Sequence, residues 1–278
     1  MNVLFYDVQR ALRNPSVIAM AILTTLLAVA LLGLILSHAR TAESNPPPSP
    51  SQLQQEATLL GIDIIGGIFG FFVPVLGLVM GTSLYAKDRS TGILDSVLCR
   101  PVTRGELVLS RFMALAGAGA AILALSLGVT DLVAYGVTGY FIDAGPLIAL
   151  YLALLVEILS FGGLVMLISH VFSSSSAIQG VSTTFFVIFS IVWYFALILL
   201  VVVEGQSNAI QTIFVADYFS PAQYGILATA FVQHTFLFGI LPLGSNSMGI
   251  MLGGLIAGGL LWTLGPVGIT YYLATRRD

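Results

Sequence analysis

The sequence predicts an all-α polytopic membrane protein with six transmembrane helices, and composition is the first observation behind this. Hydrophobic residues fill 57% of the 278 positions, and charged residues fill only 8%. A soluble domain carries about 25% charged residues. Too few charges remain to cover a water-facing surface, so we expect a single transmembrane domain, residues 1–278, that uses lipid as its solvent.

The second observation is the number of long apolar stretches. A helix needs roughly 20 apolar residues to cross the bilayer, and it satisfies its own backbone while doing so. The six stretches that qualify are residues 17–36, 64–86, 112–130, 146–169, 177–203 and 248–275. Residues 224–243 are also apolar, but Gln233 and His234 interrupt them. Within the outer loop 204–247 we therefore expect an interfacial or re-entrant hairpin instead of a seventh span.

The third observation is the placement of Lys and Arg, which concentrate in cytoplasmic loops of membrane proteins. Nine of the ten basic residues lie before the first span, between spans two and three, or after the last span, and only Arg40 lies on the opposite side. This asymmetry predicts that both termini and the loop 87–111 are cytoplasmic. An even number of spans agrees with it. We expect the protein to be located in the plasma membrane.

Residues 1–14 are predicted to form an amphipathic helix that ends before Pro15. The apolar positions are Leu4, Val8, Ala11 and Leu12, and the polar positions are Asp7, Arg10, Arg13 and Asn14. Such a helix is expected to lie along the inner membrane surface. A role as a topology anchor alone is the alternative interpretation.

The loop 87–111 is predicted to be structured. Ser90 or Thr91 can cap a short helix, which Pro101 would end. The apolar face of that helix would consist of Ile93, Leu94, Val97 and Leu98. Thr103 and Glu106 then have the T-x-x-E spacing of a capping box, which would start the helix of span three. A short rigid helix between two spans is suited to transmit force from a cytoplasmic partner.

Here the chain resembles a family. Asp88 and Gly92-Ile93-Leu94, followed by Arg100-Pro101-Val102-Thr103-Arg104 and Arg111, are similar to the loop between helices two and three of ABC-2-type transporter permeases. That pattern is an acidic residue, Gly-Thr-Leu, Arg-Pro-Val-Ser-Arg and a basic residue entering helix three. The six spans, the amphipathic N-terminal helix and the long last outer loop are also similar.

The resemblance implies a permease that pairs with a second copy of itself or with a homologous permease, and that binds separate ABC ATPase subunits. ATP-driven closure of those subunits would move the helices and export or extract a substrate. The implied coupling residues are Arg89, Gly92, Ile93, Leu94, Val97, Leu98, Arg100, Pro101 and Arg104. Alternatively, Arg100 and Arg104 only set topology and meet anionic lipid.

The sequence contains no G-x-x-x-x-G-K-[ST] phosphate loop, so ATP and Mg²⁺ are expected on the partner ATPase. We expect no cofactor in this chain and no enzymatic activity of its own. The single cysteine, Cys99, excludes a cysteine-cluster metal site. No basic tail or stripe indicates nucleic acid.

Two acidic residues inside spans are candidates for a functional role. Glu157 lies near the middle of span four, where an exposed charge costs at least a few kcal/mol. It is expected to line a polar path or join helices, or else to be a neutral hydrogen-bonded packing residue. Asp63 is expected near the outer end of span two, in contact with water.

Small-residue pairs predict close helix packing. The G-x-x-x-G pairs are Gly66/Gly70, Gly77/Gly81, Gly249/Gly253 and Gly254/Gly258. The inner turn containing His170 is expected to be solvated.

Two other function classes remain as alternatives. The first is an ion- or proton-coupled carrier or a membrane-assembly scaffold, although inverted repeats are not evident. The second, an intramembrane enzyme, is disfavoured because H-E-x-x-H and G-x-S-x-G are absent. The substrate is not readable from the sequence, although apolar spans would suit a hydrophobic or amphipathic cargo.

Overall fold

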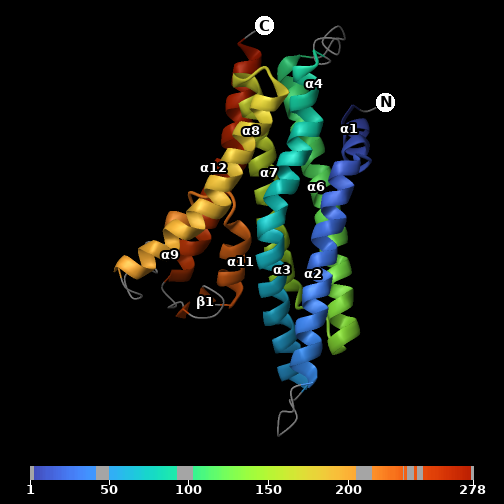
Figure 1. The fold of residues 1–278 in the computed structure, drawn as a ribbon, viewed down its shortest axis with the longest axis vertical. Helices are drawn as coiled ribbons and strands as arrows, with labels where there is room; N and C mark the ends of the chain where they lie inside the picture. Colours follow the sequence, from blue (N-terminus) through green and yellow to red (C-terminus); the bar gives the residue numbers. More distant parts are fainter. Residues whose placement is uncertain are drawn as a thin grey trace.

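The computed structural model describes residues 3–41, 50–92, 103–204, 215–233, 235–236, 241–242 and 247–276. Within these ranges six helices are long and apolar enough to cross a membrane, which confirms the predicted fold class (Figure 1). The first four spans are α2 (Pro15–Thr41), α3 (Pro50–Gly81), α6 (Arg104–Thr138) and α7 (Ala144–Val171). The last two are α8 (Ser175–Phe186) with its continuation, and α12 (Ser247–Thr275).

Two of the spans contain a π-helical stretch. Span two passes from α3 through η1 (Thr82–Ala86) into α4 (Lys87–Ser90). Span five passes from α8 through η2 (Val187–Val192) into α9 (Trp193–Glu204). A π-turn inside an α-helix accommodates an extra residue and is frequent at functional sites.

The first helix, α1 (Val3–Leu12), is separated from α2 by a turn at Arg13. Pro15 is the first residue of α2, and the Asn14 side chain accepts a hydrogen bond from the Ser16 N–H at 2.9 Å. Proline is favoured at the first helical position because its missing N–H would be unbonded there anyway. The predicted break before Pro15 is confirmed.

The end of span two differs from the prediction. Ser90 and Thr91 do not begin a new helix; their hydroxyls donate to the Lys87 carbonyl, at 3.0 and 2.9 Å, and so complete the last turn of α4. Gly92 follows with φ of 73°, the left-handed conformation that commonly ends a helix. The expected capping role of Ser90 or Thr91 is wrong, because the hydroxyls serve the preceding helix. The predicted helix at 93–98 lies outside the described residues.

The start of span three follows the prediction. The Thr103 hydroxyl accepts from the Glu106 N–H at 3.2 Å, and the Glu106 carboxylate accepts from the Thr103 N–H at 2.9 Å. This capping box begins α6 at Arg104, well before the apolar stretch that predicted the span. Hydropathy marks only the part of a helix that suits lipid, whereas the hydrogen-bonded backbone continues to its cap.

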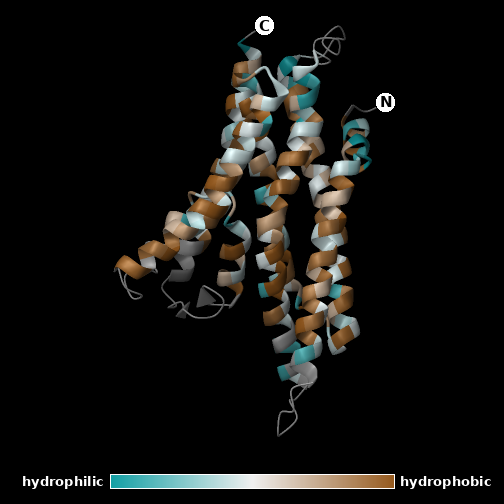
Figure 2. Cartoon of the chain, in the orientation of Figure 1, coloured by the Kyte–Doolittle hydropathy of each residue, from teal (hydrophilic) through white to brown (hydrophobic). Residues whose placement is uncertain are grey.

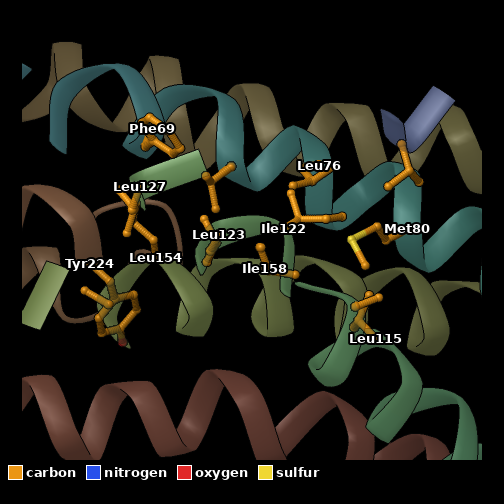
Figure 3. Packing of buried hydrophobic residues seen from close by; sticks show 14 of the residues in the cluster. Phe69, Leu76, Met80, Leu115, Ile122, Leu123, Leu127, Leu154, Ile158 and Tyr224 are labelled. Atoms are coloured by element: carbon orange, nitrogen blue, oxygen red, sulfur yellow. The ribbon is translucent and has the colours of Figure 1, made fainter. Parts of the chain in front are cut away.

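The core lies where α3, α6 and α7 meet, and their large apolar side chains point toward one another (Figure 3). Helix α7 is central: 67% of its most apolar stretch is buried within the protein, compared with 6% of that of span five. A Cβ at Gly77 or Gly81 would lie 2.8 or 2.9 Å from the carbonyl oxygens of Ile158 and Gly162. The predicted packing role of this glycine pair is confirmed at the contact of α3 with α7.

Helix α1, helix α4 and the last turns of α12 lie at one end of the bundle (Figure 1). Hydrophilic residues gather on α1 and α4 at this end, whereas the bundle between the two ends is largely hydrophobic (Figure 2). Both chain ends therefore approach the same side, as an even number of crossings requires.

The connection between spans five and six contains α11 (Tyr224–Gln233) and two short strands. Strands β1 (Thr235–Phe236) and β2 (Leu241–Pro242) pair antiparallel, with Thr235 opposite Pro242. Helix α11 has 10 residues, about 15 Å of rise, which is too short to cross a bilayer. It packs on α3 and α7, and the described residues of this connection contain no seventh helix long enough to span.

Candidate functional site

Four charged side chains from three helices meet at the end of the bundle that carries α1. We call this group the charge cluster; its members are Asp7 and Arg10 of α1, Asp88 of α4 and Arg111 of α6. Asp7, Asp88 and Arg111 are almost fully buried, and Arg10 keeps 36% of its side-chain surface. The cluster contains two positive and two negative groups, so its formal charge is zero.

Asp88 is the centre of the charge cluster. Its two oxygens accept from both terminal nitrogens of Arg10, at 2.6 and 2.7 Å, in the two-point geometry that suits a guanidinium and a carboxylate. The Arg111 Nη2 lies 3.1 Å from the same carboxylate, and its Nη1 donates to Asp7 at 2.6 Å. Arg111 therefore connects α6 to both α1 and α4.

Burial and neighbouring charges shift the pKa values of groups in the charge cluster in opposite directions. Burial raises the pKa of Asp7, and the neighbouring Arg111 and Arg10 oppose that rise. The hydrogen bond from Arg10 to Asp88 raises the pKa of Arg10. Removing one member of such a group would leave a buried charge without compensation, which costs more than the pair contributes.

The predicted coupling residues divide between described and undescribed parts of the chain. Arg89 is half-buried in α4, Gly92 ends that helix, and Arg104 is the first residue of α6. The remaining predicted coupling residues, Ile93, Leu94, Val97, Leu98, Arg100 and Pro101, lie outside the described residues. The charge cluster connects the two helix ends between which that segment runs.

A second polar site lies in the middle of the bundle, where Glu157 of α7 is fully buried. Its Oε1 accepts from the backbone N–H of Gly225, at 2.7 Å, in the first turn of α11. The first N–H groups of a helix have no partner within the helix, so a carboxyl group satisfies them well. Among the described residues Oε2 has no hydrogen-bond partner.

Gly225 lets this contact form. A Cβ at this position would lie 3.1 Å from Leu154 Cδ2 and 3.4 Å from both Glu157 Oε1 and the Cα of Gly70. Without a side chain, the first turn of α11 comes against α7 and α3 together. Glu157 thus joins a short helix to a spanning one through a hydrogen bond, which agrees both with a helix-joining role and with the alternative of a hydrogen-bonded packing residue.

Residues 215–223 reach span five beside this site. Asp217 is buried and accepts from the Trp193 indole N–H at 3.2 Å, and the Ser220 hydroxyl donates to the Phe189 carbonyl at 3.0 Å. Burial raises the pKa of Asp217 to about 7, and the bond from Trp193 opposes that rise. The connection between spans five and six is therefore held on α7 and on span five by buried carboxyl groups.

Comparison with known families now adds to this geometry. The model of the ABC-2 family transporter proteins matches residues 1–278, the whole chain. The chain belongs to the ABC-2 transporter family. No curated protein matches it as a relative. Family membership identifies an integral membrane component of a transporter, and it implies association with an ABC ATPase subunit.

In this ABC-2 protein the charge cluster contains both ends of the motif that carried the resemblance. Asp88 is the acidic residue before Gly92, and Arg111 is the basic residue entering span three. Their side chains form an ion pair 3.1 Å apart across the segment between them. The structure thus brings together two residues that lie 23 positions apart in the sequence.

Asp63 of the ABC-2 protein is half-buried and lies near one end of the candidate span Thr58–Ser90, while helix α3 itself continues to Pro50. His170 differs from expectation. His170 is buried in the last turn of α7, 3.3 Å from the Tyr85 hydroxyl, and its ring stacks on Tyr85. The solvated turn is shorter than predicted, because Ser174 already caps α8.

An apolar cavity of about 370 Å³ lies between α7, α11 and α12. Leu152, Val156, Phe231 and Leu255 are among its lining side chains, and Tyr224 borders it beside Glu157. No group of three or more His, Cys, Asp or Glu side chains in the described ranges could hold a metal ion.

Sequence reasoning did not find that Asp7, Arg10, Asp88 and Arg111 meet. It placed Asp7 and Arg10 on the polar side of an amphipathic helix, and it used Arg111 for topology and for the family resemblance. One signal was available: Arg111 lies two turns inside α6, where an unpaired charge would be costly. A second was the i, i+3 spacing of Asp7 and Arg10, which places opposite charges on one helix face.

Proposed function

We propose that this chain is the permease subunit of an ABC transporter, in which a separate cytoplasmic ATPase drives export of a substrate. The observation that carries the proposal is the charge cluster, which connects α1, α4 and α6 around the segment that resembles the coupling loop. Membership of the ABC-2 family supports the same role.

The mechanism depends on stiffness. The cytoplasmic end of span two is helical to Ser90, and span three is helical from Arg104. Because Arg111 bonds to Asp7 and Asp88, a push on the segment between these helix ends moves α1, α4 and α6 together. The glycine contacts of α3 with α7 then transmit the movement to the centre of the bundle.

The proposal includes a second permease copy. Only 6% of the most apolar stretch of span five is buried within the chain, and only 17% of that of span one. On α9, Phe195, Leu199, Val202 and Val203 are 63–76% exposed. A second copy covering part of this surface would bring two coupling segments to two ATPase subunits.

Charge reversal in the coupling segment tests the proposal. Arg100→Glu with Arg104→Glu should lower permease-stimulated ATP hydrolysis about tenfold in the complex with its native ATPase, equivalent to about 1.4 kcal/mol of docking free energy. The matched control, Arg276→Glu, changes an exposed basic residue near the end of α12 and should leave the stimulation unchanged.

The variants must insert normally, which membrane fractionation and size-exclusion chromatography would check. Unchanged stimulation by the double variant, or a purified native complex without an ATPase subunit, would contradict the proposed coupling. Transport into inside-out vesicles, with cargo classes compared with and without ATP, would test export and identify the cargo.

A further inference from the structure

A polar cavity of about 390 Å³ lies between α1, the start of α2 and the π-helical end of span two. Three basic side chains line it: Arg10, Arg13 and Lys87. Neutral hydrogen-bonding side chains complete the lining, among them Tyr6, Gln9 and Asn14. Helices α1 and α4, which contribute to its lining, lie at the end of the bundle that carries both chain ends (Figure 1).

Two of the three cations are not neutralised in this cavity. Both terminal nitrogens of Arg10 bond to Asp88, so the charge of this arginine is already compensated. Arg13 and Lys87 are exposed, and no carboxylate in the described part of the chain lies within ion-pair distance of either. The cavity therefore has an excess of positive charge.

The start of α2 adds to this excess. Asn14 and Pro15 line the cavity, and α2 begins there with the partial positive charge of a 27-residue helix. Cations, amide groups and a helix N-terminus are the groups that bind phosphate oxygens in proteins. The chemistry of the lining therefore suits a phosphate ester.

The flanking side chains favour a phosphate that belongs to a lipid. Phe5 and Tyr6 on α1 are 66% and 54% exposed, as expected for aromatic residues that lie in the membrane interface. The adjacent start of span one exposes Ile18 and Ile22, which acyl chains would cover. A basic pocket at this depth is a site for an anionic headgroup.

We propose that this cavity binds the phosphate headgroup of an anionic phospholipid of the inner leaflet, with Arg13 and Lys87 as its ligands. Because Arg10 belongs both to the cavity lining and to the charge cluster, the lipid lies beside the ion pairs that join α1 to α4. The headgroup thereby stabilises the docked position of α1.

Native mass spectrometry of the purified chain tests the site. The probes are phosphatidylglycerol and phosphatidylcholine, and the variant is Arg13→Gln with Lys87→Gln. The wild-type protein should retain phosphatidylglycerol in preference to phosphatidylcholine, and the double variant should bind phosphatidylglycerol about 30-fold more weakly, five- to sixfold per cation. Both side chains are exposed, so folding should be unaffected.

Arg276→Gln is the matched control, because it removes one cation from the same end of the molecule outside the cavity. Equal retention of the two lipids, equal loss in the control, or unchanged binding in the double variant would overturn the proposal. A further arm adds inorganic phosphate alone. Displacement of the lipid by millimolar phosphate would assign the site to a free anion and would also overturn it.

Discussion

Two short helices in the described part of the chain do not cross the membrane, α1 and α11, and they are docked on the bundle in different ways. Each has 10 residues, and each is held through a buried carboxyl group. Asp7 of α1 bonds to a guanidinium, Arg111, whereas Glu157 bonds to the backbone N–H of Gly225 in α11. In the first case the short helix supplies the acid, and in the second the spanning helix supplies it.

The difference follows from depth. At the end of the bundle, where lipid headgroups and water are near, arginines can be accommodated, and two cations can offset two carboxylates. In the middle of α7 none of the described cations lies against Glu157, so the start of a helix serves as the positive partner. Ion pairing thus holds α1, and helix-end hydrogen bonding holds α11.

Among the substitutions that test this comparison, removal of Arg111 should lower the free energy of unfolding most. Arg111→Met leaves Asp7 buried without its cation, so the free energy of unfolding should fall by about 3–5 kcal/mol. Thermal unfolding of the detergent-purified protein, followed by tryptophan fluorescence, measures the loss. Asp7→Asn added to Arg111→Met should recover part of it, while Arg276→Met should be neutral. No recovery in the double variant would show that Asp7 does not depend on Arg111.

Glu157 is the next test. Glu157→Leu removes the acceptor of the Gly225 N–H and should cost about 1–3 kcal/mol, because a buried donor is left unsatisfied. Glu157→Gln keeps an oxygen in place and should cost clearly less. Labelling of a cysteine introduced at Thr229, in a Cys99→Ser background, should increase only in the leucine variant. If glutamine and leucine are equally harmful, the carboxylate charge itself holds α11.

Arg10 should matter less than Arg111. Arg10→Gln removes a two-point contact from a side chain that is 36% exposed, and Asp88 keeps Arg111 at 3.1 Å. We expect a loss of about 1 kcal/mol, which should shrink at high salt. The same unfolding assay, without anionic lipid, should show no effect of the neighbouring Arg13→Gln. A loss of stability as large as that of Arg111→Met would show that Arg10 is as important to the charge cluster as Arg111.

The last test is a pH dependence at Asp217. Burial raises the pKa of Asp217 to about 7, so between about 4, the unfolded value, and about 7 the folded state binds the proton more tightly than the unfolded state. Its contribution to stability is therefore largest at low pH and is lost as the pH rises to 7. Asp217→Asn should flatten the wild-type profile across this window while keeping an acceptor for Trp193. Parallel profiles would show that Asp217 does not titrate there.

The sequence was sufficient for the features that depend on local pattern. Apolar length predicted the six spans, and the T-x-x-E spacing of Thr103 and Glu106 predicted the capping box. The interruption at Gln233 correctly argued against a seventh span. These features depend on residues a few positions apart, whose interactions are set by helix geometry alone.

The sequence was insufficient where distant side chains combine. Nothing local pairs Asp7 with Arg111, 104 positions away, or places Glu157 beside Gly225, 68 positions away. Ser90 and Thr91 were misassigned because a hydroxyl can serve either the start of one helix or the end of another, and only the backbone path decides.

The π-turn of η1 (Thr82–Ala86) determines the direction in which Asp88 points. One residue accommodated in a wider turn rotates everything beyond it by about 100° relative to an uninterrupted α-helix. Asp88 follows this turn by two positions, so its carboxylate faces Arg10 and Arg111 only with that rotation in place. Loss or migration of the π-turn would swing the acid away from both arginines without unfolding span two, so η1 sets the rotation of α4 relative to the bundle at the end that carries α1.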